Sequence, residues 1–237
     1  MKKKTIYICI SILLIIILLV LGYHLYQKNN TDAMIFKREY ESLNGKINEK
    51  NDLEYPSVSI SSNNPFIYKE LPDIVNLINN RETFLVYFGF ESCPWCRNIV
   101  PNIIKAASDL KINEIYYVNI KNSRNVMIIN EDNNLETIKM GTDAYYKLIN
   151  LLDNVLDDYE LINLKGKTVN AGKRIYAPNI IAVINGKAVD ITTGISDKQT
   201  DPYINMDDKM QKESYEKIKE VLSNLKVDNA CSAQTAC

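Results

Sequence analysis

The sequence is poor in the residues that most often hold metals or act as catalytic bases. It contains one histidine, His24, among 237 residues. Metal sites built on imidazole and cysteine–histidine catalytic pairs are therefore nearly excluded. The chain also lacks an excess of charge of either sign, because 28 lysines and arginines balance 29 aspartates and glutamates. Contact with the phosphates of a nucleic acid needs a strongly basic face, so we expect no nucleic-acid partner.

One long apolar run is present, at the N-terminus. Residues 6–21 are apolar apart from Ser11, and three lysines precede them at 2–4. The run is long enough to cross a bilayer with some tilt, and no small-x-small cleavage pattern follows it. By the positive-inside bias, the lysines stay in the cytoplasm and everything after about Tyr26 faces outward. We therefore expect residues 1–26 to be a single-pass transmembrane anchor, with a cleaved signal peptide or a buried core helix as the alternatives.

Cysteines are few, and most lie in two close pairs. Apart from Cys9 in the apolar run, the chain has Cys93, Cys96, Cys231 and Cys237. An even number in an oxidising compartment suggests disulfides. The small polar tail at 227–237 is expected to close a local disulfide between Cys231 and Cys237, or to serve as an auxiliary redox pair for Cys93. A zinc site made of all four cysteines is a further alternative, but the spacing in the tail is unusual for zinc.

The rest of the chain divides by composition into a polar segment and an α/β domain. Residues 27–64 have no sustained apolar period and are expected to form a stalk. The domain is expected at 65–226, with an insert at about 121–174 built on a helix and a small hairpin. The expected elements are helices at 68–80, 142–158 and 210–225, buried strands at 83–90 and 115–120, and a hairpin at 180–193 that turns at Asn185-Gly186. This order predicts an α/β sandwich with one parallel crossover and an antiparallel pair.

The Cys93-Pro94-Trp95-Cys96 sequence lies where a strand is followed by a helix. A helix N-terminus offers unpaired N–H groups and a partial positive charge, both of which stabilise a thiolate. Cys93 is therefore predicted to be the attacking thiolate, and Cys96, one turn further in, the resolving thiol. Trp95 is expected to be a flat apolar contact for the substrate or, as the alternative, plain surface packing. A purely structural disulfide between the two cysteines is the other reading of the motif.

Two segments resemble the thioredoxin superfamily. Residues 93–101 (CPWCRNIVP) look like its active-site turn with the proline that kinks the helix, and residues 177–187 (APNIIAVINGK) look like its cis-proline, the following strand and the Asn-Gly turn. The resemblance implies a thioredoxin-like fold with a helical insert before the cis-proline loop. It also implies that Ala177 and Pro178 flank the substrate channel, and that the activity is thiol–disulfide exchange without a cofactor or metal.

The stretch from about 58 to 226 is also similar to Gram-positive thioredoxin-like proteins of the bacteriocin transport accessory type, through GTDAYYKLINLLD, GKRIYAPN and TGISDKQTDPY. One departure is Tyr87, which stands where typical thioredoxins have a buried acid. The expected partners are thiols or disulfides of exported proteins or peptides, the membrane, and a transmembrane redox donor or acceptor. The alternative from another class is a non-catalytic accessory or binding protein of a peptide-export or surface complex.

Overall fold

The structure is a computed structural model that describes residues 7–8, 13–22 and 30–234, with side chains up to residue 225. Its centre is a five-stranded mixed sheet in the order β11-β10-β4-β5-β3. The strands β3, β4 and β5 run parallel, whereas β10 is antiparallel to both β4 and β11. Their bounds are β3 (Phe66–Tyr68), β4 (Phe84–Gly89), β5 (Ile115–Asn119), β10 (Asn179–Ile184) and β11 (Lys187–Thr192).

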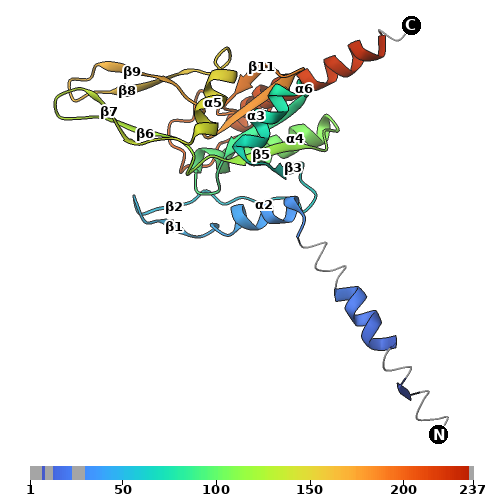
Figure 1. The fold of residues 1–237 in the computed structure, drawn as a ribbon. Coiled ribbons are helices and arrows are strands. Elements are labelled where there is room, and N and C mark those ends of the chain that lie inside the picture. The colour runs from blue at the N-terminus through green and yellow to red at the C-terminus, as the bar shows by residue number, and fades with distance from the viewer. Residues whose placement is uncertain (1–6, 9–12, 23–29, 235–237) are drawn as a thin grey trace.

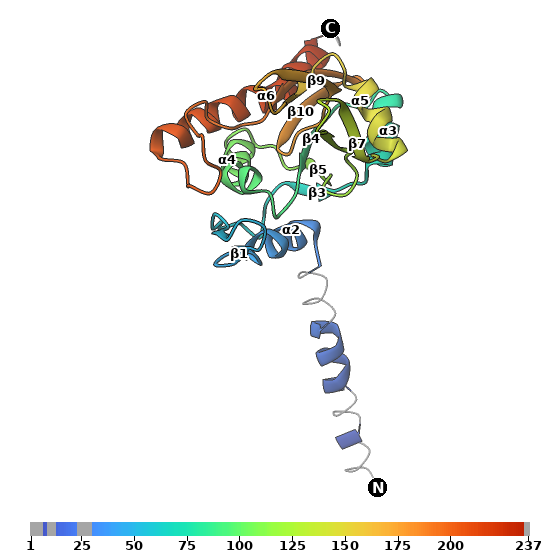
Figure 2. The same ribbon diagram turned by 90° about the vertical axis from the view of Figure 1, so that its left-hand side faces the viewer.

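Strand β4 is buried along its whole length and divides the core into two halves. Because side chains alternate along a strand, Leu85 and Tyr87 face one half, and Phe84, Val86 and Phe88 face the other. Helices α2 (Asp32–Glu41), α4 (Pro94–Asp109) and α6 (Asp208–Gln234) cover the first face, while α3 (Leu71–Asn79) and α5 (Asp143–Leu151) cover the second. The result is a sheet between two layers of helices (Figures 1 and 2).

The polar segment 27–64 is not a stalk over the part that the structure describes. Helix α2 begins after Thr31, whose hydroxyl accepts from the Met34 N–H, and its Phe36 and Tyr40 are 0% exposed. Phe36 stacks on Phe66 of the sheet with ring centroids 4.0 Å apart. The stalk prediction was wrong because two aromatic residues four positions apart bury this helix. Residues 27–29 lie outside the described residues.

A buried arginine of α4 fixes the same segment to the domain. Arg97 is 0% exposed, and its guanidinium donates to the carbonyl oxygens of Pro56 and Tyr40, each at 2.6 Å, and to the Asn44 side chain at 2.7 Å. Burial lowers the pKa of this guanidinium. The segment carries the short strands β1 (Ile47–Asn48) and β2 (Leu53–Glu54).

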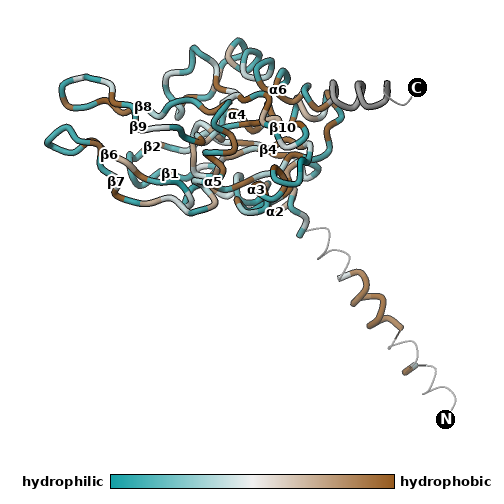
Figure 3. Tube along the Cα trace, turned by 45° about the horizontal axis from the view of Figure 1, so that its top comes forward, coloured by the Kyte–Doolittle hydropathy of each residue, from teal (hydrophilic) through white to brown (hydrophobic). Residues whose placement is uncertain are grey.

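The insert at 121–174 is mainly made of β-hairpins and is not a helical insert. Strands β6 (Val126–Ile129) and β7 (Leu135–Lys139) form one hairpin, and β8 (Asp158–Ile162) and β9 (Thr168–Lys173) form another. The helix between them, α5, is nine residues long. Both hairpins project from the same end of the domain (Figures 1 and 3).

The structure does not support the predicted transmembrane anchor at 1–26. The described residues 13–22 are helical and uniformly hydrophobic (Figure 3). In the described part of the chain, no helix has the length and apolar character needed to span a membrane. The single-pass localisation rested on that anchor and is corrected with it; residues 1–6, 9–12 and 23–26 are not described.

The C-terminal tail predicted from residue 227 onward continues helix α6, which runs to Gln234. The side chain of Cys231 and the whole of Cys237 lie outside the described part of the chain, and so does the predicted disulfide or auxiliary redox pair.

Candidate thiol site

The site is built where β4 ends and α4 begins. Cys93 is the N-cap residue of α4, with extended backbone angles, and its N–H donates to the Phe90 carbonyl at 3.2 Å. Its sulfur accepts from the Cys96 backbone N–H at 3.4 Å, as the side chain of an N-cap residue does. Pro94 occupies the first helical position, where no N–H is needed.

A second segment approaches Cys93 from the loop before β10. The Cys93 thiol donates to the Ala177 carbonyl oxygen, with 3.2 Å between sulfur and oxygen, and the peptide bond between Ala177 and Pro178 is cis. The structure therefore brings together four of the predicted site residues: Cys93, Cys96, Ala177 and Pro178. Cys93 is 5% exposed, so its sulfur lies just beneath the surface.

The two cysteines are free thiols, and their surroundings shift their acidities in opposite directions. Hydrogen bonding from the Cys96 thiol lowers the pKa of Cys93, and the backbone N–H groups of Cys96 and Trp95 and the charge of Arg124 lower it further, against the effect of burial. Burial raises the pKa of Cys96 well above its ordinary value, and the neighbouring Cys93 raises it further. Such a pair can hold one charge on its outer sulfur and one proton on its inner sulfur.

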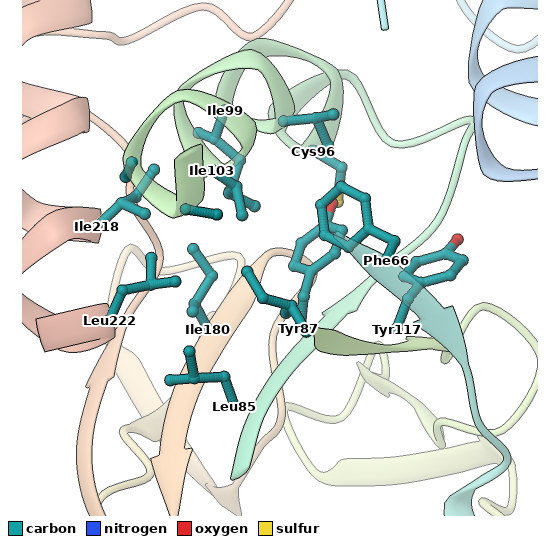
Figure 4. Close-up of a cluster of buried hydrophobic side chains, with 14 of the residues drawn as sticks. Phe66, Leu85, Tyr87, Cys96, Ile99, Ile103, Tyr117, Ile180, Ile218 and Leu222 are labelled. Carbon is teal, nitrogen blue, oxygen red and sulfur yellow. The ribbon is translucent and has the colours of Figure 1, made fainter. Parts of the chain in front are cut away.

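The inner sulfur faces tyrosine hydroxyls instead of a carboxylate. Tyr87, on β4, hydrogen-bonds to the Cys96 sulfur, and its hydroxyl lies 3.0 Å from that of Tyr40 on α2. Tyr117, on β5, stacks on Tyr87 with ring centroids 5.6 Å apart. All three rings are 0% exposed. Figure 4 shows Tyr87 directed from the sheet toward Cys96.

Basic side chains of the insert surround the outer rim of the site. Lys121 and Arg124 lie over the Phe90 ring, at 5.9 Å and 5.4 Å from its centroid. Lys121 also donates to the Ser92 hydroxyl at 2.7 Å. The sequence offered no sign of this arrangement, because Lys121 and Arg124 precede an Asn-rich stretch that resembles a loop.

Trp95, predicted to contact the substrate or to be plain surface packing, is the remaining residue of the site. The Trp95 side chain is half-buried and packs against the core on the α4 side of the sheet.

Among the described residues, no group of three or more His, Cys, Asp and Glu side chains is placed to hold a metal ion. The four-cysteine zinc alternative includes Cys231 and Cys237 and therefore falls outside this observation.

Comparisons with known proteins leave the family open. No protein-family model matches the chain, and no curated protein matches it. The resemblance to the thioredoxin superfamily therefore stays a prediction from the residues themselves.

Proposed function

We propose that the protein is a thiol–disulfide oxidoreductase in which Cys93 is the nucleophile and Cys96 the resolving thiol. The observation that carries the proposal is the position of the Cys93 sulfur at the N-cap of α4, where it accepts from the Cys96 backbone N–H at 3.4 Å and lies 3.2 Å from the Ala177 carbonyl oxygen of the cis-proline loop. The opposite directions in which the surroundings shift the two thiol pKa values support it. A thiolate is the reactive form of cysteine, and a helix N-terminus with N–H donors favours it. A pair of thiols with perturbed acidities, whose outer member lies just beneath the surface, is a candidate reactive site.

The exchange proceeds in two steps that balance without a cofactor. The Cys93 thiolate attacks a sulfur of the substrate disulfide, forms a mixed disulfide and expels one substrate thiolate, which takes up a proton from water. Cys96 then attacks the Cys93 sulfur, the bond between Cys93 and the substrate breaks, and the second substrate thiolate leaves. The substrate is reduced by two electrons and the Cys93–Cys96 pair is oxidised; the reverse sequence oxidises a substrate dithiol.

The surroundings of Cys93 favour a polypeptide as the substrate. The two hairpins of the insert expose large apolar side chains, among them Ile138 at 58%, Ile162 at 74% and Leu164 at 84%. Arg174, three residues before Ala177, donates to the Asn125 carbonyl oxygen at 3.2 Å. This hydrogen bond joins the base of one hairpin to the base of the other. The hairpins therefore begin close to the site and carry exposed apolar side chains along their length, and exposed apolar surface commonly marks a site of protein interaction.

The proposal is tested by trapping the mixed disulfide. In the full chain with Cys9, Cys231 and Cys237 changed to Ser, Cys96→Ala should accumulate a covalent adduct with a disulfide-containing peptide, detected by mass spectrometry. Cys93→Ala in the same background is the matched control and should form none. If the Cys93→Ala chain forms as much adduct as the Cys96→Ala chain, or if Cys93 does not react at neutral pH, the proposal is wrong and the accessory-protein alternative is favoured.

The direction of exchange is set by the reduction potential of the pair. Equilibration with glutathione or dithiothreitol measures it. A value near or below about −250 mV supports a reductase, and a value above about −180 mV supports an oxidase or isomerase.

A further inference from the structure

Two tyrosine hydroxyls lie in a row beside the resolving thiol, and the exchange steps described above give them no role. Cys96 is 0% exposed, Tyr87 hydrogen-bonds to its sulfur, and the Tyr40 hydroxyl lies 3.0 Å from the Tyr87 hydroxyl. We infer that Tyr87 and Tyr40 form a two-hydroxyl donor chain that stabilises the Cys96 thiolate during the resolving step. The inference rests on the proposed function, because it assigns these tyrosines as positioning residues in that reaction.

The need for such donors follows from burial. A buried thiolate loses its hydration and must be compensated by hydrogen bonds or by charge. Within residues 30–225, the titratable groups that act on Cys96 are Cys93 beside it, the three tyrosines of the sheet and α2, and Arg124. Once Cys93 is in a mixed disulfide it carries no charge. The charged form of Cys96 is then favoured by the hydrogen bond from Tyr87, by a backbone hydrogen bond at Phe90 and by the charge of Arg124.

The row of hydroxyls from Tyr40 to Tyr87 can act as a donor to Cys96 because a hydroxyl can donate one hydrogen bond while it accepts another. Toward a Cys96 thiolate, Tyr40 donates to Tyr87 and Tyr87 donates to the sulfur. In the dithiol pair the Cys96 thiol donates its proton to the Cys93 sulfur, and Tyr87 remains a donor to the Cys96 sulfur. Burial raises the pKa of both tyrosines well above their ordinary values, so both keep their protons throughout. In the resolving step the proton of Cys96 ends on the departing substrate thiolate, and the tyrosines are unchanged.

Three elements far apart in the sequence hold the two hydroxyls and the Cys96 sulfur in place. Tyr87 comes from β4, Cys96 from α4 and Tyr40 from α2, the helix that Arg97 fastens to the domain. The Tyr117 ring stacks on Tyr87, yet its own hydroxyl makes no hydrogen bond to Tyr87 or to Cys96. Tyr117 is therefore a matched control: it has the same kind of ring in the same cluster, but its hydroxyl does not lie between Tyr40 and the Cys96 sulfur.

The test separates the two steps with Ellman's reagent, a small aromatic disulfide that releases one coloured thiolate per step. In the full chain with Cys9, Cys231 and Cys237 changed to Ser, the first release reports attack by Cys93 and the second reports resolution by Cys96. We expect Tyr87→Phe to leave the first rate unchanged, to slow the second by roughly 10- to 100-fold, and to raise its pH midpoint. Tyr40→Phe should slow the second step less, and its effect should disappear in a Tyr87→Phe background.

Tyr117→Phe should leave both rates and the pH midpoint unchanged. The inference is overturned if Tyr87→Phe leaves the second rate and its midpoint unchanged, or if Tyr117→Phe slows the second step equally. A first release that does not depend on Cys93 is a different result, since it refutes the proposed function itself. An unchanged first rate also shows that each variant has kept the site folded.

Discussion

The ring of Tyr87 lies against Gly89, two residues further along the same face of strand β4. A Cβ atom built on Gly89 would overlap the hydroxyl oxygen and the ring of Tyr87. Since side chains two apart on a strand share a face, any larger residue at 89 competes with Tyr87 for the space beside Cys96. The glycine thus makes room for the hydroxyl that contacts the resolving thiol.

Gly89→Ala is expected to displace Tyr87 and to lower the free energy of unfolding by about 1–3 kcal/mol, because the core at this point has no spare volume. Urea unfolding measures the loss. A Tyr87→Val change should relieve the overlap, so the double variant should lose less than the sum of the two single variants. Additive losses would contradict a clash between these two residues.

Arg97→Ala is expected to cost at least about 3 kcal/mol, because it leaves four acceptors without their charged donor: the carbonyl oxygens of Pro56, Tyr40 and Glu91 and the Asn44 side chain. Three of them belong to the segment around Tyr40 and Pro56, so residues 31–64 should also become more sensitive to limited proteolysis. Lys105→Ala is the control on the same helix, since Lys105 is an exposed member of an ion pair with Asp109. Equal destabilisation by both changes would contradict this role of Arg97.

The central elements of the domain could be predicted from the sequence because their patterns are local. The apolar run at 83–90 corresponds to β4 at Phe84–Gly89, and the run at 115–120 corresponds to β5 at Ile115–Asn119. The Asn185-Gly186 turn joins β10 to β11, and both of its residues have positive φ, 50° and 73°. These signals need no knowledge of the rest of the chain.

Other elements depend on contacts that no local pattern contains. Helix α2 is held by Phe36 stacking on Phe66, thirty residues away, and by Arg97. The β6–β7 hairpin was missed because its strands flank Asn-rich sequence, in which Asn133 takes a positive φ of 62° at the turn. In the site, Cys93 and Cys96 were predicted from their spacing, but Tyr40 reaches them only through folding of a segment that was expected to be a stalk.

Glu213→Gln is expected to destabilise the protein at neutral pH. Its carboxylate accepts from the Asp197 N–H at 2.9 Å and the Ser196 hydroxyl at 2.7 Å, and lies 3.1 Å from the Lys217 ammonium. These donors lower the pKa of Glu213 from 4.5 to about 2. Because the folded protein binds the proton less readily than the unfolded chain, the stabilisation is present above about pH 4.5 and is lost as the pH falls through about 2.

The measurement is urea unfolding of wild type and Glu213→Gln between pH 2 and pH 7, with the exposed Glu216→Gln on the same helix as the control. The difference between wild type and Glu213→Gln should shrink across the acid range, whereas the control should match wild type throughout. A constant difference would mean that the carboxylate charge is not the source of the stabilisation.

Cys93 is expected to ionise at a lower pH than an ordinary thiol. Its rate of alkylation by iodoacetamide should rise with pH to a midpoint below that of an ordinary thiol, because the Cys96 thiol and backbone N–H groups stabilise its thiolate. Cys96→Ala removes the largest of these contributions and should raise the midpoint. An unchanged midpoint in Cys96→Ala would contradict a hydrogen bond between the two sulfurs.

The same shifts have a consequence for stability that can be measured independently. Between the pKa of Cys93 in the folded protein and that of an ordinary thiol, the unfolded chain binds more protons, so the contribution of Cys93 to stability rises with pH. Above the ordinary thiol pKa the buried Cys96 still keeps its proton, so the folded state binds more protons than the unfolded chain. The contribution of Cys96 to stability therefore falls with pH. The difference in free energy of unfolding between the dithiol protein and a Cys93→Ala/Cys96→Ala variant should therefore pass through a maximum near the ordinary thiol pKa. A difference that only rises or only falls across this range would show that one of the two thiols is not shifted as its surroundings require.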